Sequence, residues 1–150
     1  MKVLIADDDL VSRRLLLNYL QKWGYDVTVA TNGLDAWQKF AEGDFQIVIS
    51  DWMMPELDGP DLIRRIRAES RPNYVYTILL TARSRKEDLV AGMDAGADDF
   101  VSKPFERDEL QVRLRAGERI VKLERALEDQ NRALREAQAT LNKVGDRPGE

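Results

Sequence analysis

Short apolar runs alternate with amphipathic stretches along the first 120 residues, and this alternation constrains the fold more than any other feature of the sequence. Apolar residues between the runs recur at helical spacing, beginning with a helix expected from Leu10 to Trp23. Apolar strands joined by helices form a parallel sheet, because a crossover helix is needed to return the chain to the same edge. The sequence therefore predicts an α/β domain with helices on both faces of a five-stranded sheet, whose strands are Val3–Ala6, Val27–Ala30, Ile47–Ser50, Tyr74–Leu80 and Phe100–Val101.

The composition restricts the available chemistry. The 150 residues include no cysteine and no histidine, which excludes thiolate and imidazole metal ligands and histidine general bases. Any reaction must then use carboxylates, hydroxyls, lysines and hard metal ions. The net charge of −4 provides no basic surface, so we expect no direct nucleic-acid binding. No run of about 18 apolar residues occurs, and we therefore expect a cytoplasmic protein without membrane contact.

Polar residues gather where the predicted strands end. Asp7–Asp9 follow the first strand, Asp51 the third and Thr81 the fourth, and Lys103 lies just beyond the fifth. Ligands of open parallel sheets bind outside this carboxyl edge. The aspartate triplet alone could simply cap a helix, but carboxylates gathered at one edge repel each other unless a cation such as Mg²⁺ offsets their charge. Beside a cation and Lys103, Asp51 becomes a candidate nucleophile for phosphoryl transfer.

Four motifs in a fixed order carry a resemblance to a known family. Taken together, they resemble the receiver domain of bacterial two-component response regulators in both content and spacing: Ile5–Asp9, Asp51–Gly59, Leu80–Ala82 and Val101–Phe105. The resemblance covers residues 1–120. It implies a flavodoxin-like, doubly wound sheet with strand order 2-1-3-4-5. It also implies that a sensor histidine kinase or a phosphotransfer protein is the phosphate donor.

The resemblance also implies roles for individual residues. Asp51 would be the phosphoacceptor and Lys103 would pair with the phosphoryl group. Mg²⁺ would be held by Asp8, Asp51 and the backbone carbonyl of Met53, with Asp7 acting through water. A cis bond between Lys103 and Pro104 would aim the lysine into the site, and the sequence does not determine whether that bond is cis.

A conformational switch is the second implication of the resemblance. Thr81 would donate its hydroxyl to a phosphoryl oxygen once the phosphate is present. Phe100 stands where the family often has a switch tyrosine, and it lacks the phenolic hydroxyl. A switch through Phe100 would therefore work by packing alone, and the alternative is that Phe100 is only a core aromatic.

The last thirty residues follow a different pattern. Apolar residues recur in heptads over residues 121–144, which predicts a coiled-coil extension of the fifth helix with a seam at Ile120, Leu123, Leu127, Leu134 and Leu141. The pairs Arg125–Asp129 and Glu128–Arg132 are expected along the exposed side of this helix. The favoured interpretation is a homodimer through this helix, with parallel pairing preferred over antiparallel pairing but the direction left open. The alternative is a single helix that lies back on its domain or frays. Residues 145–150 are expected to form a disordered tail or the start of a linker.

These observations predict a phosphorylation-controlled switch that performs only its own phosphotransfer and slow autodephosphorylation. Three alternatives remain open. The chain could be the receiver-plus-linker portion of a regulator with a diguanylate cyclase or phosphatase output, or a constitutive coiled-coil scaffold. It could also be an Asp-nucleophile phosphohydrolase, although Met53 stands where such enzymes need a second aspartate.

Overall fold

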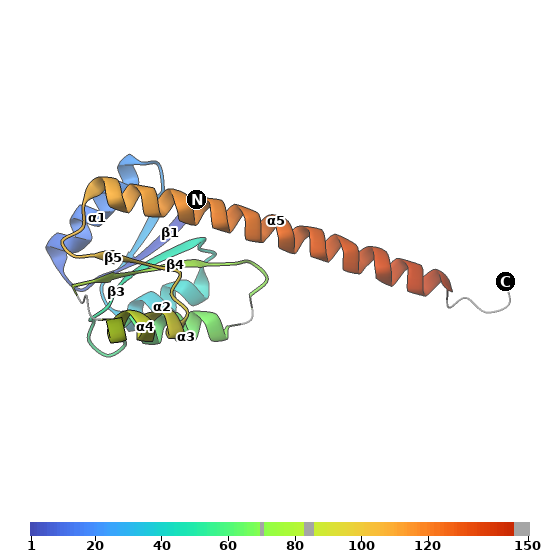
Figure 1. The fold of residues 1–150 in the computed structure, drawn as a ribbon, viewed down its shortest axis with the longest axis horizontal. Coiled ribbons are helices and arrows are strands. Elements are labelled where there is room, and N and C mark those ends of the chain that lie inside the picture. Colours follow the sequence, from blue (N-terminus) through green and yellow to red (C-terminus); the bar gives the residue numbers. More distant parts are fainter. Residues whose placement is uncertain (70, 83–85, 146–150) are drawn as a thin grey trace.

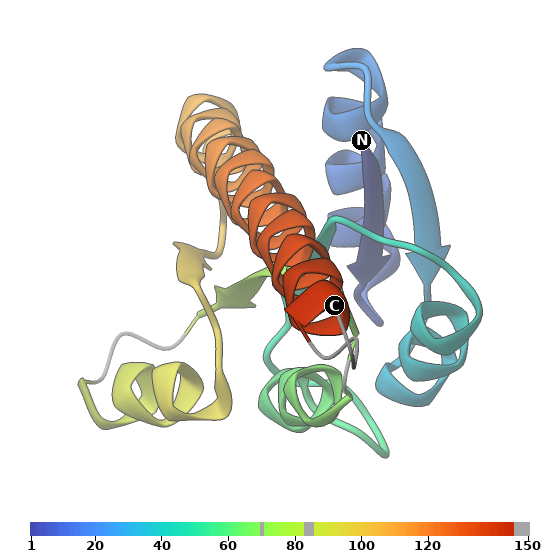
Figure 2. The ribbon, with the colours of Figure 1, turned by 90° about the vertical axis from the view of Figure 1, so that its right-hand side faces the viewer.

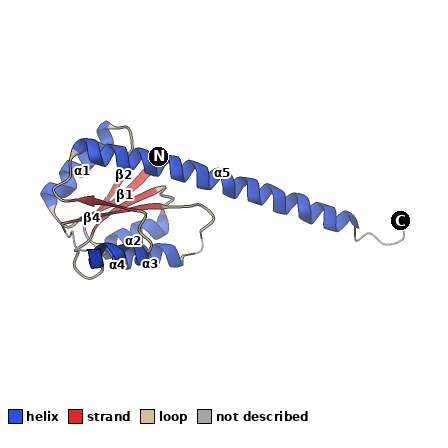
Figure 3. Cartoon of the chain, viewed as in Figure 1, coloured by secondary structure: helices blue, strands red, loops and turns tan. Residues whose placement is uncertain are grey.

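Five strands and five helices alternate along the part of the chain that the structure describes (Figures 1 and 3). The computed structural model describes residues 1–69, 71–82 and 86–145. The strands are β1 (Lys2–Ala6), β2 (Asp26–Ala30), β3 (Ile47–Asp51), β4 (Tyr76–Thr81) and β5 (Asp99–Ser102). The helices are α1 (Leu10–Lys22), α2 (Gly33–Glu42), α3 (Gly59–Ala68), α4 (Lys86–Ala95) and α5 (Arg107–Gly145).

The sheet has the order β2-β1-β3-β4-β5, and every neighbouring pair is parallel. This confirms the predicted doubly wound, flavodoxin-like architecture. Strand bounds differ from the prediction by up to two residues. The largest difference is at β4, which begins at Tyr76 because the first ladder pair with β3 is Ile47 with Tyr76.

Helices cover both faces of the sheet, as the apolar strands require. Helices α1 and α5 lie on one face, whereas α2, α3 and α4 lie on the other (Figure 2). Each face has its own core. The α1/α5 side buries Val3, Ile5, Leu16, Leu20, Ile47, Ile49, Ile78, Leu110, Leu114 and Val121. The opposite side buries Leu4, Phe40, Val48, Leu62 and Ile66 against α2 and α3, with a smaller cluster of Trp52, Ile63, Leu79 and Ala97 beside it.

Helix α5 is far longer than the sheet is wide and projects beyond it (Figure 1). Its first half packs on the sheet so closely that a Cβ atom at Gly117 would lie 2.6 Å from the Tyr76 ring. No break marks the expected boundary after residue 120. Gly145, expected to begin the tail, is the last residue of α5, a one-residue difference at a helix end. Residues 146–150 of the predicted tail lie outside the described residues. Within the described part of the chain, no helix is long and apolar enough to cross a membrane.

Candidate functional site

The carboxyl edge of the sheet brings the predicted site residues together. Asp51 is the last residue of β3, and Asp7 directly follows β1, whose Ala6 pairs with Ser50 of β3. Thr81 ends β4 on the other side of β3 and is buried. Lys103 follows β5, and its amide donates to the carbonyl of Thr81 at 2.8 Å. The parallel order of the strands therefore places these groups side by side.

Lys103 is the electrostatic centre of the site. Its Nζ lies 2.9 Å from Oδ2 of Asp51 and 3.3 Å from Oδ2 of Asp7. Burial raises the pKa of the Asp51 carboxyl above its ordinary value, and the hydrogen bond from Lys103 only partly offsets this. Burial alone would lower the pKa of Lys103, but its two carboxylate partners raise that pKa above the ordinary value. The Lys103–Pro104 peptide bond is cis, which answers the question that the sequence left open.

Three carboxylates could hold a metal ion. Asp7, Asp8 and Asp51 each offer an oxygen, and the three oxygens lie within 4.8 Å of one another. Asp7 is fully buried and Asp8 is exposed, so the cluster reaches from the sheet edge to the surface. Hard cations with oxygen ligands, Mg²⁺ above all, suit such a donor set.

The three aspartates after β1 have different surroundings: Asp9 caps α1, and Asp7 and Asp8 belong to the acidic cluster. Asp9 is the N-cap of α1, because its side chain accepts from the amide of Ser12 at 3.0 Å. The amide of Asp9 in turn donates to Oδ1 of Asp7 at 2.9 Å. The helix cap that the sequence left open as an alternative role for the triplet is thus provided by Asp9, and Asp7 and Asp8 remain available to the cluster.

Met53 and Phe100 lie around the acidic cluster. Met53 follows β3 in the loop beyond Asp51, with an exposed side chain. The metal role of its backbone carbonyl stays a prediction. Phe100 lies in β5, and its half-buried ring stacks on Trp52 with centroids 6.4 Å apart. A Cβ atom at Gly92 of α4 would lie 2.7 Å from the Phe100 ring, so the ring is held between α4 and the residue next to Asp51.

Sequence reasoning missed two supporting residues. Gly59 begins α3 so close to the phosphoacceptor candidate that a Cβ atom there would lie 2.4 Å from the carbonyl oxygen of Asp51. Arg13 of α1 is the second of these residues, and its Nη1 donates to the carbonyl of Asp7 at 3.0 Å. Its position one turn into α1, directly after the capping Asp9, was the available signal for this contact.

The predicted seam residues lie far from this site, on α5. Ile120, Leu123, Leu127, Leu134 and Leu141 are between 36% and 70% exposed. The structure brings them together as one unpacked stripe along the helix and does not bring them to the acidic cluster. The predicted pairs Arg125–Asp129 and Glu128–Arg132 are wrong: Asp129 pairs with Arg132, Glu128 with Arg135, and Arg125 with Asp44 of the receiver-like part.

Comparison with known proteins identifies the family of the chain. Residues 3–115 match the family model of the response regulator receiver domain. The chemotaxis protein CheY1 of Helicobacter pylori is 36% identical over 116 residues, which are 76% of this chain and 94% of that protein.

Solved structures give the same result. The receiver domain of Francisella response regulator 1452 is 34% identical, with a TM-score of 0.72 over 77% of this chain and 94% of that one. A probable two-component system response regulator/GGDEF domain protein is 27% identical, with a TM-score of 0.76 over 81% of this chain and 50% of that one. The chain belongs to the response regulator receiver domain family.

Proposed function

We propose that the chain is a signalling switch in which Asp51 accepts a phosphoryl group, with Mg²⁺, from a sensor histidine kinase or a phosphotransfer protein. One observation carries the proposal: a buried carboxylate at the sheet edge lies 2.9 Å from Lys103 Nζ and shares a cluster with Asp7 and Asp8. Phosphoryl transfer needs positioning and charge neutralisation more than covalent help, and this arrangement supplies both.

The transfer step uses an oxygen of Asp51 as the nucleophile. That oxygen attacks the phosphorus of the donor's phosphohistidine. A P–O bond forms as the P–N bond breaks, and the imidazole nitrogen keeps the electron pair of the broken bond. Lys103, already within hydrogen-bond distance of Asp51, would then pair with the oxygens of the new acyl phosphate. The 150 residues contain no histidine, so the donor group lies outside this sequence.

The donor set fits Mg²⁺. Asp8, Asp51 and the backbone carbonyl of Met53 would hold the ion, and Asp7 would contact it through water. When bound, Mg²⁺ supplies positive charge against the phosphoryl oxygens. Thr81 would donate its hydroxyl to a phosphoryl oxygen, and movement of Thr81 would change the packing of Phe100, which already stacks on Trp52.

Phosphorylation by acetyl phosphate with Mg²⁺ tests the site, with the acyl phosphate counted by intact-protein mass spectrometry. We expect one phosphoryl group on the wild-type chain and none on Asp51→Asn. Asp8→Asn removes a proposed metal ligand and should strongly raise the Mg²⁺ concentration that phosphorylation requires. Asp9→Asn should leave that concentration unchanged, because Asn caps a helix as well as Asp. Phosphorylation that persists in Asp51→Asn would refute the assignment. Repeated turnover of small phosphate esters would instead favour the phosphohydrolase alternative.

A second proposal concerns the stripe of apolar residues along α5. At about 100° per residue, Leu123, Leu127 and Leu134 lie roughly 200–240° around the helix from the buried Val121, on the side away from the sheet. A second copy of the chain can therefore pair with this stripe without meeting either receiver domain. The heptad spacing favours a coiled coil with a second copy of the chain over residues 121–144 as the occupant.

Sedimentation equilibrium tests the pairing. Leu134→Glu places a charge in the seam and should shift the chain to monomer, whereas Ala139→Glu places the same charge on the far side of the same segment and should not. Beryllofluoride with Mg²⁺ should change the dimerisation of the wild type if pairing is coupled to Asp51. A dimer that is unchanged by Leu134→Glu and by beryllofluoride would contradict the proposal. A dimer that Leu134→Glu disrupts but beryllofluoride leaves unchanged would favour the constitutive scaffold.

The output remains a proposal by analogy. One solved relative carries a GGDEF domain, and this chain covers half of that protein. The receiver and its helical extension could equally lead into an enzymatic output, and reading the parent gene past Glu150 distinguishes this from a stand-alone regulator.

A further inference from the structure

The middle of helix α5 lies at the end of the sheet opposite to Asp51. Tyr25, between α1 and β2, lies near Glu118 of α5, and burial together with this nearby carboxylate raises the Tyr25 pKa well above its ordinary value. Asp44, between α2 and β3, pairs with Arg125. Three inter-element loops thus face one stretch of the helix, the third being the loop before β4.

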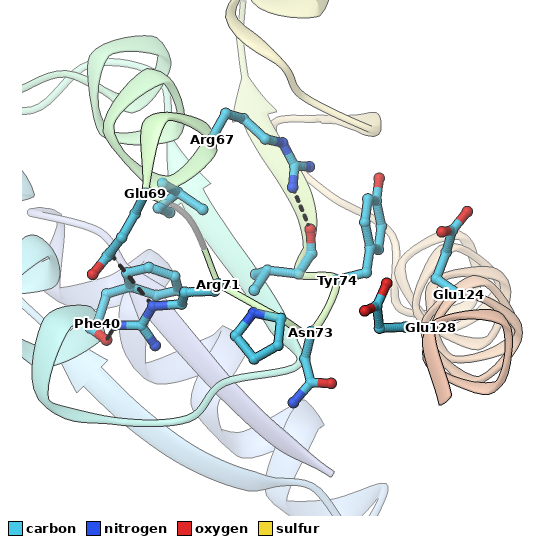
Figure 4. Close-up of a pocket in the computed structure, with 11 residues that line it drawn as sticks. Phe40, Arg67, Glu69, Arg71, Asn73, Tyr74, Glu124 and Glu128 are labelled. Carbon is cyan, nitrogen blue, oxygen red and sulfur yellow. Dashed lines mark hydrogen bonds and ion pairs between the residues drawn. The ribbon is translucent and has the colours of Figure 1, made fainter. Parts of the chain in front are cut away.

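That third contact is a cleft of about 290 Å³ between α3, the loop before β4 and α5. Figure 4 shows Glu124 and Glu128 of α5 on the side of the helix that faces Tyr74 and Asn73. The charge of Glu124 contributes to raising the pKa of Tyr74, although burial and the hydrogen bond to Asp98 contribute more. The helix therefore stays close to the receiver as far as Glu128, eight residues past the expected boundary.

Arg125 is the unusual residue in this stretch. It lies about 40° around the helix from the buried Val121, on the side that packs against the domain. Its side chain is only 22% exposed, and within the described residues its Nε and Nη2 atoms are buried without a hydrogen-bond partner. Nη2 lies 3.8 Å from Oδ1 of Asp44, a carboxylate that is 67% exposed.

A buried guanidinium held by one carboxylate is poor evidence for stability. Desolvating the charge costs about as much as the pair returns, and apolar residues often serve such positions equally well. What the pair does supply is direction, because it joins a charge on α5 to a carboxylate of the receiver, Asp44. An exposed alternative, Asp129 one turn away, is left to Arg132.

We propose that Arg125, through Asp44, is a positioning residue that fixes the direction in which α5 leaves the receiver. The receiver and the first half of the seam, Ile120 to Leu127, then move as one rigid unit. This inference goes beyond the phosphotransfer role and does not require it, since every contact that carries it lies at the other edge of the sheet.

Distances between two spin labels on the full-length chain test the proposal. The sequence has no cysteine, so Asn18→Cys on α1 and Ala139→Cys on the projecting part of α5 label the protein without background. Labelled chains are diluted with unlabelled chains, so that only distances within one chain are read. Neither Mg²⁺ nor a phosphate donor is present.

We expect one narrow distance distribution in the parent and loss of that single peak in Arg125→Ala. Arg132→Ala is the matched control: Arg132 has the same heptad position one repeat later, pairs only within the helix, and should leave the peak unchanged. Asp44→Asn, a change of one exposed side chain, should broaden the peak without affecting folding. Helix content by circular dichroism and the urea midpoint should stay nearly constant in all variants.

Identical distributions for Arg125→Ala and Arg132→Ala would overturn the proposal, and so would an Asp44→Asn chain indistinguishable from the parent. Neither result would bear on Asp51. Conversely, a chain that cannot be phosphorylated but shows the narrow peak and its loss in Arg125→Ala would refute the proposed function and leave this inference standing.

Discussion

Replacing Lys103 with methionine should destabilise the protein through charge alone. Methionine keeps most of the side-chain volume but leaves the carboxylates of Asp51 and Asp7 facing each other at the sheet edge. At an effective dielectric constant of about 20, the attraction across the 2.9 Å contact with Asp51 is about 6 kcal/mol before desolvation is subtracted. Removing one partner of a buried pair costs about 3–5 kcal/mol, and the 21% exposure of Lys103 favours the low end, about 3 kcal/mol.

Urea unfolding at neutral pH, with a chelator present, measures this loss as a fall in the free energy of unfolding. Adding Asp51→Asn to Lys103→Met should recover much of the loss, since the repulsion then disappears. Mg²⁺ should also recover part of it, because the ion replaces the missing positive charge. Arg64→Met is the control: Arg64 pairs with Asp61 on the surface and its loss should cost less than about 1 kcal/mol. Equal stabilities for Lys103→Met and the wild type would refute the reasoning.

Three further expectations follow from the same structure. The raised pKa of Asp51 means that its charge costs stability above the folded-state pKa. Asp51→Asn should therefore raise the urea midpoint at neutral pH, by an amount that shrinks as the pH falls from the folded-state pKa to the ordinary aspartate pKa. Gly59→Ala should cost about 1–3 kcal/mol of unfolding free energy by overpacking and slow acetyl phosphate labelling of Asp51. Gly24→Ala is the control: the added Cβ would have no atom within 4 Å, but the φ of +89° strains any side chain. This change should lower stability and leave acetyl phosphate labelling of Asp51 unchanged. The raised Tyr25 pKa implies stability that is complete below the ordinary tyrosine pKa and lost as the pH rises through the folded-state value. Glu118→Gln should lower that value in a tyrosinate difference-spectrum titration, and an unchanged titration would contradict the Tyr25–Glu118 contact.

The sheet and the edge cluster could be predicted because each depends on a local signal. Apolar runs such as Ile47–Ser50 specify strands buried on both faces, and the parallel order then gathers whatever follows them at one edge. Asp7, Asp51 and Lys103 are far apart in the sequence, yet each directly follows a strand, and so their meeting needed no knowledge of side-chain contacts.

The strand pattern does not determine how a helix or loop packs on the sheet, so side-chain contacts of those elements could not be predicted in this way. Arg125 reads as a surface residue of a charged helix, and helical spacing favours Asp129, one turn later, as its partner. The structure pairs it with Asp44 because the buried Leu114 and Val121 rotate that side of the helix toward the receiver. The close approach of Gly59 to Asp51 likewise depends on how the loop after β3 returns to the sheet.

The two edges of the sheet are connected by a single helix. Lys103 lies immediately before α5 at the Asp51 edge, and from Arg107 to Arg125 the helix rises about 27 Å. A five-residue strand such as β1 spans only about 17 Å, so α5 crosses the whole sheet before Arg125 reaches Asp44. Along this path Leu110, Leu114 and Val121 are buried in the α1/α5 core, which resists bending. A displacement of α5 beside Lys103 would therefore move the seam residues together with the rest of the helix, because no flexible linker lies between them.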